Sequence, residues 1–219
     1  VGPGWISWGV ESFLDEIAHK QGQDPVAMRL SMLDGEGKNA GGAGSTAGGA
    51  RRLARVLKDV ADRAGWGRNM PANEGLGIGV GHGQERGMPT WVACVAHVAV
   101  DPVSGDVTLK KLWQTIDVGT VVNPDGAMAQ AEGAALWGVS LALHEGAAFA
   151  AGEVAEQNLD RYTPLRMRDV PELDIAFIDS EEFPSGLGEP PLIPVAPAIG
   201  NAIFAASGQR VRELPIRLS

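Results

Sequence analysis

One carboxylate stands in a segment suited to holding it still: the sequence GLGEPP, residues 186–191, places Glu189 between glycines and prolines. The glycines leave the backbone bare, and the prolines restrict it. The apolar run behind this segment carries no charge until Arg210. Because desolvation disfavours a charged carboxylate, a Glu in such surroundings is a candidate general base. An ordinary turn with a solvated Glu fits the same spacing.

Other common catalytic arrangements find little support in the residue pattern. No serine nucleophile elbow and no Cys–His pair is evident, and Glu189 has no partner carboxylate of the glycosidase kind. A hydrolase that uses Glu189 with water therefore has no nucleophile or metal to support it. None of the histidines shows metal-ligand spacing, and only His82, in a glycine-rich stretch that could equally be a hairpin loop, is a candidate. They are His19, His82, His97 and His144.

Composition limits the class of protein. The chain has 219 residues, 44% of them hydrophobic and 21% charged, with a formal net charge of −9. This balance is typical of a globular protein and disfavours a nucleic-acid binder. The lone Cys94 lies in an alternating apolar run, which predicts a buried thiol. One cysteine cannot hold an iron–sulfur cluster, so any such centre must come from another chain.

The first residues and the hydropathy of the chain indicate whether it belongs to a longer protein and whether it spans a membrane. The first residues have neither an initiator Met nor the pattern of a signal peptide, which predicts that the chain is cut from a longer protein. No uninterrupted apolar stretch has the length of a bilayer span, so no transmembrane segment is expected. The compartment stays open between bacterial cytoplasm and periplasm.

Hydrophobic periodicity predicts an α+β fold, with mixed sheet hairpins and packed helices. Helices are expected over residues 10–21, from 25 onward, and over 50–64, 127–143 and 196–207. Strands are expected over residues 75–81, 91–100, 107–116 and 174–179, with a further strand pair across 147–156. Residues 1–34 and 50–66 form a helical part, residues 35–49 a flexible glycine-rich insert, and residues 75–219 the α+β part.

Helical periodicity also predicts which side chains share a face. In the first helix Phe13, Leu14, Ile17 and Ala18 form the apolar face, and Glu11, Asp15, Glu16 and His19 lie on others. In the third helix seven charged residues are expected on the exposed side, namely Arg51, Arg52, Arg55, Lys58, Asp59, Asp62 and Arg63.

Glycines at particular positions predict close approaches. Alternating glycines in the strand over 75–81 indicate that backbone or ligand approaches it. The helix over 127–143 is rich in small residues, including Gly133 and Gly138, so another backbone or a bulky cofactor can approach it closely.

Several ordered motifs together resemble one family. They are DVG at 117–119, NP at 123–124, QAEG at 130–133, NLDRY at 158–162, PLRM at 164–167, GEPP at 188–191 and AIFAA at 202–206. The set resembles the large subunit of the xanthine oxidase family of molybdenum hydroxylases. The nearest branch is the isoquinoline 1-oxidoreductase type with its aldehyde-oxidising relatives. The similarity spans nearly the whole chain, interrupted by the glycine-rich insert.

The resemblance implies roles for particular residues. Glu189 corresponds to the family's catalytic base, close to the metal without binding it. Gln130 corresponds to a glutamine that donates a hydrogen bond to the pterin, although a helix-surface Gln is the alternative. Gly133 would admit the cofactor or serve helix packing, and Gly188 would expose backbone near the metal. Tyr162 and Arg166 could line the substrate entrance; core packing or a surface ion pair is the alternative.

The resemblance also implies cofactors, partners and a reaction. The molybdenum would be held by a molybdopterin cytosine dinucleotide, and iron–sulfur clusters would lie on a small [2Fe-2S] subunit. The reaction would hydroxylate an N-heteroaromatic carbon or oxidise an aldehyde, with water as the oxygen source. Family subunits are several times longer, and a family Met-Gly-Gln segment is absent, so the chain is expected to be a C-terminal portion whose N-terminal remainder completes the site. A non-catalytic scaffold or interaction domain of the same fold is the alternative.

Overall fold

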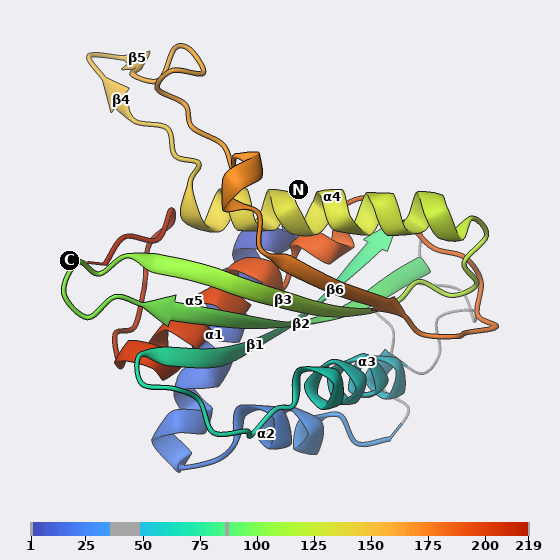
Figure 1. Ribbon diagram of the computed structural model, residues 1–219. Helices are drawn as coiled ribbons and strands as arrows, with labels where there is room; N and C mark the ends of the chain where they lie inside the picture. The colour runs from blue at the N-terminus through green and yellow to red at the C-terminus, as the bar shows by residue number, and fades with distance from the viewer. Residues whose placement is uncertain (1, 36–48, 86–87, 219) are drawn as a thin grey trace.

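The computed structural model describes residues 2–35, 49–85 and 88–218, and most of the predicted insert lies outside these residues (Figure 1). The helices are α1 (Pro3–Gln21), α2 (Pro25–Met32), α3 (Gly49–Ala64), α4 (Pro124–Leu143) and α5 (Val195–Ser207), with 3₁₀ turns η2 (Met167–Asp169) and η3 (Pro190–Leu192). The strands are β1 (Glu74–Glu85), β2 (Met88–Val100), β3 (Val107–Asp117), β4 (Phe149–Ala150), β5 (Glu153–Val154) and β6 (Glu172–Phe177). The predicted α+β class is confirmed.

The main sheet has the strand order β1-β2-β3-β6. Strands β1, β2 and β3 pair antiparallel, and β6 joins β3 in parallel. The strands predicted over residues 91–100 and 107–116 therefore form a hairpin, β2–β3, and β1 extends further than its glycine pattern predicted. The short strands β4 and β5 form the other predicted pair and project beyond α4, away from the sheet (Figure 1).

Helices cover both faces of the sheet. One core packs α3 against alternate residues of β1 and β2, and the other packs α4 and α5 against the opposite face (Figure 1). Cys94 lies fully buried in the second core, and this burial raises the pKa of its thiol. Because both faces are covered, β2 is apolar on both sides rather than on alternate residues only.

A row of glycines on β1 lets α5 lie directly on the strand. A methyl group on Gly77 would stand 2.0 Å from the backbone nitrogen of Ala202, and one on Gly79 would stand 2.6 Å from the carbonyl oxygen of Pro194. Close approach of backbone was one of the two predicted reasons for these glycines, and at this strand it is the reason observed. Gly75 likewise meets the backbone of α5, whereas Gly81 and Gly83, which continue the row, face the side chains of Ile193 and Pro190.

Helix α1 follows its predicted amphipathic pattern only in part: Ala18 of the predicted apolar face is buried, and Leu14 and Ile17 are half-buried. It buries Glu11 and Asp15, whereas Phe13 is exposed. The reason is its neighbour, because β1 is an edge strand whose backbone groups need partners. The Glu11 carboxylate accepts from the Val80 N–H at 3.0 Å, and the Ser7 hydroxyl donates to the Val80 carbonyl at 3.3 Å.

Two arginines of α3 also depart from the predicted exposed side. Arg52 is buried and donates two hydrogen bonds to Asp117, at 2.6 and 2.8 Å. Arg63 reaches over the sheet and donates to the Gln114 carbonyl at 2.8 Å and to the Asp174 carbonyl at 2.9 Å. Periodicity missed both because their partners are the end of β3 and the parallel strand β6, which only the tertiary fold brings near.

Among the described residues one helical stretch, Pro190–Ser207, has the length and mean hydropathy, 1.2, of a membrane span. Two thirds of it, 67%, is buried within the fold. Packing of α5 as a core helix against β1 and β2 accounts for its apolar character.

Candidate functional site

Glu189 is half-buried and immediately precedes η3, at the end of the loop that follows β6. The backbone around it is held from the sheet side. The buried Gln114 side chain on β3 donates to the Pro191 carbonyl at 2.5 Å, and the Thr90 hydroxyl on β2 donates to the Gly186 carbonyl at 2.5 Å. These contacts fix the backbone on both sides of the carboxylate.

The loop that leads from β3 to α4 supports the same region. Asp117, paired with Arg52, also accepts from the Gly119 N–H at 3.1 Å, and Asn123 caps α4 by accepting from the Gly126 N–H at 3.1 Å. Gly119 has φ of 73°, and a side chain there would strike the Phe183 carbonyl. Asp117 and Asn123 therefore organise this loop.

Helix α4 presents one stripe of residues beside Glu189. Gln130, Gly133 and Trp137 are exposed at i, i+3 and i+7, which places them on one side of the helix. The Gln130 amide donates to the Gly188 carbonyl at 3.4 Å, so these two predicted site residues are brought together. Gly138 meets Val195 closely, and this contact brings α4 against the start of α5.

An apolar cavity of about 260 Å³ lies at one end of this stripe, and Glu189 is on its wall. Apolar side chains from α1, α4, α5 and the C-terminal segment form most of the lining, together with a second carboxylate, Glu145. The apolar lining includes Trp5, Trp137, Leu141, Leu192, Ile193, Ala196, Leu214 and Pro215. Sequence reasoning missed Glu145, and Trp137 could have been found from its seven-residue spacing to Gln130.

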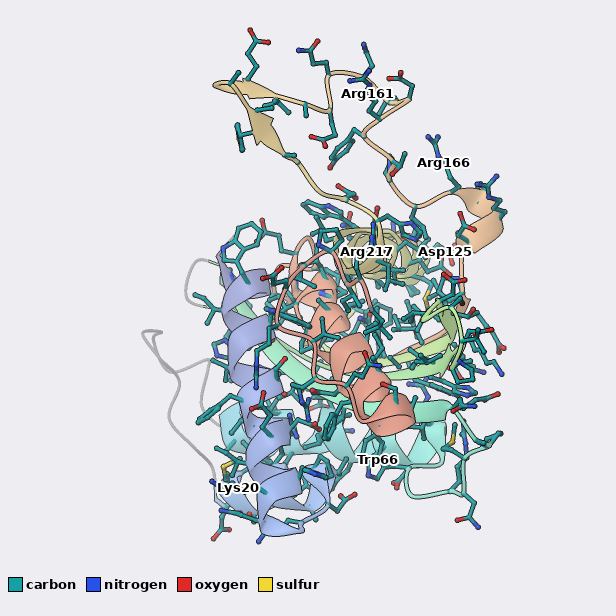
Figure 2. All side chains as sticks on the ribbon, turned by 90° about the vertical axis from the view of Figure 1, so that its left-hand side faces the viewer. Lys20, Trp66, Asp125, Arg161, Arg166 and Arg217 are labelled. Carbon is teal, nitrogen blue, oxygen red and sulfur yellow. The ribbon has the colours of Figure 1, made fainter. Side chains whose placement is uncertain are left out.

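The two predicted entrance residues lie on the arm formed by residues 144–168. Tyr162 donates a hydrogen bond to Glu145, and this bond raises the pKa of the tyrosine. Tyr162 therefore reaches the cavity wall through Glu145. Arg166 is exposed and donates to the Leu159 carbonyl at 3.3 Å, and it points away from the helical layers in Figure 2. The structure does not bring Arg166 to the cavity.

The positions of the His, Cys, Asp and Glu side chains show whether the protein itself could ligate a metal ion. No group of three or more His, Cys, Asp or Glu side chains that could hold a metal ion occurs in the described part of the chain. His82 lies within β1, with its ring 5.2 Å from that of Trp91.

The open side of the α4 stripe leaves room for a bulky organic group. A Cβ atom built on Gly133 or on Gly188 would meet no atom within 4 Å, so both glycines face open space. Between them the Gln130 amide offers a donor and an acceptor to a polar heterocycle. Glu189 is placed where this open side meets the apolar cavity. Fold and site together place the half-buried carboxylate of Glu189 between an open helix face and an apolar cavity.

The comparisons with known proteins agree on one family. Residues 44–171 match the model of the molybdopterin cofactor-binding domain. A membrane-bound aldehyde dehydrogenase (pyrroloquinoline-quinone) of Gluconacetobacter polyoxogenes is 52% identical over 99% of this chain and 28% of its own length. The isoquinoline 1-oxidoreductase subunit beta of Brevundimonas diminuta is 30% identical over 99% of this chain and 26% of its own. The chain belongs to the xanthine oxidase family, as part of a molybdopterin-binding subunit.

Solved structures show the same fold. The aldehyde oxidoreductase of Desulfovibrio gigas superposes with a TM-score of 0.73 and 16% identity, over 98% of this chain and 40% of that one. The chain spans roughly a quarter of the length of the two curated relatives, 28% and 26%. The predicted family and branch are thus confirmed.

Proposed function

We propose that the complete subunit containing this chain oxidises an aldehyde to a carboxylic acid, with Glu189 as the general base. The observation that carries the proposal is the position of Glu189, between the open face at Gly133 and the apolar cavity. The 52% identity to a protein named as an aldehyde dehydrogenase supports the substrate class.

The reaction converts an aldehyde and water into a carboxylate, three protons and two electrons. When bound, the molybdenum cofactor supplies the two-electron redox chemistry. Glu189 accepts the proton that the water-derived oxygen loses as it attacks the carbonyl carbon. The cavity walls, among them Trp137 and Leu192, hold the apolar part of the aldehyde and exclude water. Gln130 and the bare backbone at Gly188 bind and orient the pterin.

Hydroxylation of an N-heteroaromatic carbon is the second candidate, supported by the 30% identity to an isoquinoline 1-oxidoreductase subunit. It needs the same base and the same water-derived oxygen. A series of aliphatic aldehydes, benzaldehyde and isoquinoline, each assayed with an artificial electron acceptor, separates the two. Turnover of the aldehydes alone is the expected result.

We further propose a molybdopterin cytosine dinucleotide as the cofactor form and a small [2Fe-2S] subunit as the electron-accepting partner. The lone Cys94 cannot ligate a cluster, so the clusters lie outside these residues, and the name of the 30% identical relative, a subunit beta, supports a partner chain. The N-terminal remainder of the subunit would supply the rest of the cofactor site.

The test is chemical analysis of the purified complete subunit with its partners. We expect about one molybdenum per subunit, cytidine monophosphate after acid hydrolysis, and iron and labile sulfide that co-purify with the partner. The name of the 52% identical relative makes pyrroloquinoline quinone the competing cofactor. A folded, active complex that holds this quinone and no molybdenum would overturn the proposal.

A further inference from the structure

The outward face of α1 is an apolar stripe with no cover among the described residues. Ile6 is 65% exposed, Val10 50% and Phe13 61%, and their spacing at i, i+4 and i+7 places them on one side of the helix. Trp5, 62% exposed, extends the stripe at its N-terminal end. In Figure 2, α1 lies at the outside of the molecule, with α5 on its inner side. A contiguous apolar stripe of this kind is typical of an interaction surface.

The helix cannot turn this stripe inward, because its other face is fixed by buried ionic contacts. Glu11 accepts from the Nε of Arg29 at 3.0 Å, in addition to its bond with β1. Asp15 accepts from Arg210 at 2.7 Å, and Arg210 in turn donates to Asn201 on α5 at 2.8 Å. Rotation of α1 would leave these charges buried without partners, which costs several kcal/mol per ion.

The stripe runs into the cavity at Glu189. Gly4 and Trp5, at the start of α1, line that cavity together with Glu189 and Leu192. Any segment that lies along the stripe therefore reaches the rim of the cavity and adds to its wall.

Most of a subunit of this family lies outside the residues of this chain, as the 28% coverage of the 52% identical relative indicates. We propose that an apolar segment of the remaining polypeptide of the same subunit packs along Trp5, Ile6, Val10 and Phe13 and completes the wall of the cavity at Glu189. The segment thereby sets how large an aldehyde the site accepts. This inference rests on the proposed place of the chain within a longer molybdenum-binding subunit.

The chemistry of the stripe disfavours a lipid surface. A helix that lies in a membrane interface keeps its polar face in water and is usually rich in Lys and Arg there. The polar face of α1 is instead buried against β1 and α5, and residues 3–18 contain no Lys or Arg. The net charge of −9 also works against binding to anionic lipids.

The experiment labels thiols in the folded complete subunit. Phe13→Cys introduces a reporter into the stripe, and Val103→Cys, at a site 95% exposed in the β2–β3 turn, is the matched control. Cys94 gives little background because it is buried. With a maleimide reagent and peptide mass analysis, we expect the Val103→Cys site to label at least tenfold faster than the Phe13→Cys site. Equal, rapid labelling at both sites would overturn the proposal.

A photo-crosslinker identifies the occupant. With p-benzoylphenylalanine in place of Phe13, we expect adducts to peptides of the same subunit from outside residues 1–219. Mixed isotope-labelled and unlabelled subunits distinguish contacts within one copy from contacts between two copies. Adducts to a second copy, to another protein, to lipid or to residues 1–219 of the same chain would overturn the proposal. Neither labelling nor crosslinking requires turnover. Subunits that contain no molybdenum but still label slowly at Phe13→Cys would contradict the proposed function and leave this inference standing.

Discussion

At the scale of single residues, the site combines one carboxylate with neighbours that leave space beside it. Gln114 and Thr90 hold the backbone around Glu189 at 2.5 Å each. Gly133 and Gly188 carry no side chain into the space that faces them. In the proposed mechanism the cofactor occupies that space.

Filling the space at Gly133 tests this account. Gly133→Leu places a side chain where no atom now lies within 4 Å, and leucine is a better helix former than glycine by up to about 1 kcal/mol. We expect the free energy of unfolding to stay equal or rise, while molybdenum content falls at least tenfold. Glu132→Leu, on an exposed residue about 100° around the same helix, is the control and should keep its molybdenum. Full molybdenum content in Gly133→Leu would contradict a cofactor surface at this residue.

Some residues of the site lie in short sequence motifs, and others are placed there only by the tertiary fold. Glu189 and Gln130 could be named as candidates because each lies in a short motif that matches the family, and their roles stay predictions. Glu145 could not, because its place on the cavity wall depends on the path of the chain from α4 into the arm, which no local pattern encodes. Arg52 was expected on the surface for the same reason, since its partner Asp117 is 65 residues away along the chain.

At the scale of elements, the glycine row of β1 sets how closely α5, and with it η3 and Glu189, approach the sheet. Here the local pattern was sufficient, because glycine at every second position clears one face of a strand, and a cleared face indicates that a backbone or a ligand packs there. Which face of α1 is buried was not predictable in the same way. An apolar stripe indicates that the helix makes a contact, but it does not say whether the partner lies within these residues.

Replacement of one glycine in this row should disturb the fold measurably. In Gly77→Ala the new methyl group would meet the backbone of Ala202 at 2.0 Å and of Ala198 at 2.3 Å, and backbone cannot rotate away as a side chain can. We expect the free energy of unfolding of the complete subunit to fall by about 3 kcal/mol, at the upper end of the usual cost of overpacking. Urea denaturation measures it. Gly9→Ala, with open space around it on a helix, should cost nothing. Equal stability of the two variants would show that α5 lies further from β1.

Loss of the buried ion pair between Glu11 of α1 and Arg29 of α2 should lower the free energy of unfolding by an amount that depends on pH. Burial raises the pKa of Glu11, and the Arg29 guanidinium opposes that rise. Arg29→Met removes the opposition, so the folded-state pKa of Glu11 rises further above its unfolded value. A raised folded-state pKa contributes stability that is present below the unfolded pKa and is lost as the pH rises through the folded pKa.

The cost of Arg29→Met should therefore be about 3–5 kcal/mol at pH 7 and smaller near pH 5. Thermal or urea unfolding at the two pH values measures it. Arg212→Met breaks the exposed pair that Arg212 makes with Glu16 of α1, and it should cost far less than Arg29→Met at pH 7 and change little between the two pH values. A cost for Arg29→Met that does not change with pH would mean that Glu11 is not the group responsible.

At the scale of the whole molecule, the α+β class, the β2–β3 hairpin and the family were accessible from the sequence, because they depend on local periodicity and on ordered motifs. The placement of α1 and the projection of the arm bearing β4 and β5 were not. Both leave apolar side chains exposed, among them Phe13 at 61% and Phe149 at 78%. This chain covers only 28% of the 52% identical relative. In a subunit of that length, other parts of the polypeptide are available to cover these side chains.

The role of Glu189 is tested most directly by the turnover of Glu189→Gln in the complete, cofactor-loaded enzyme. Glutamine keeps the size of the side chain and removes the proton acceptor, so kcat for aldehyde oxidation should fall by about 100-fold or more while molybdenum content and the unfolding transition stay as in the parent. Parental kcat with full molybdenum content would contradict the assignment of Glu189 as the base.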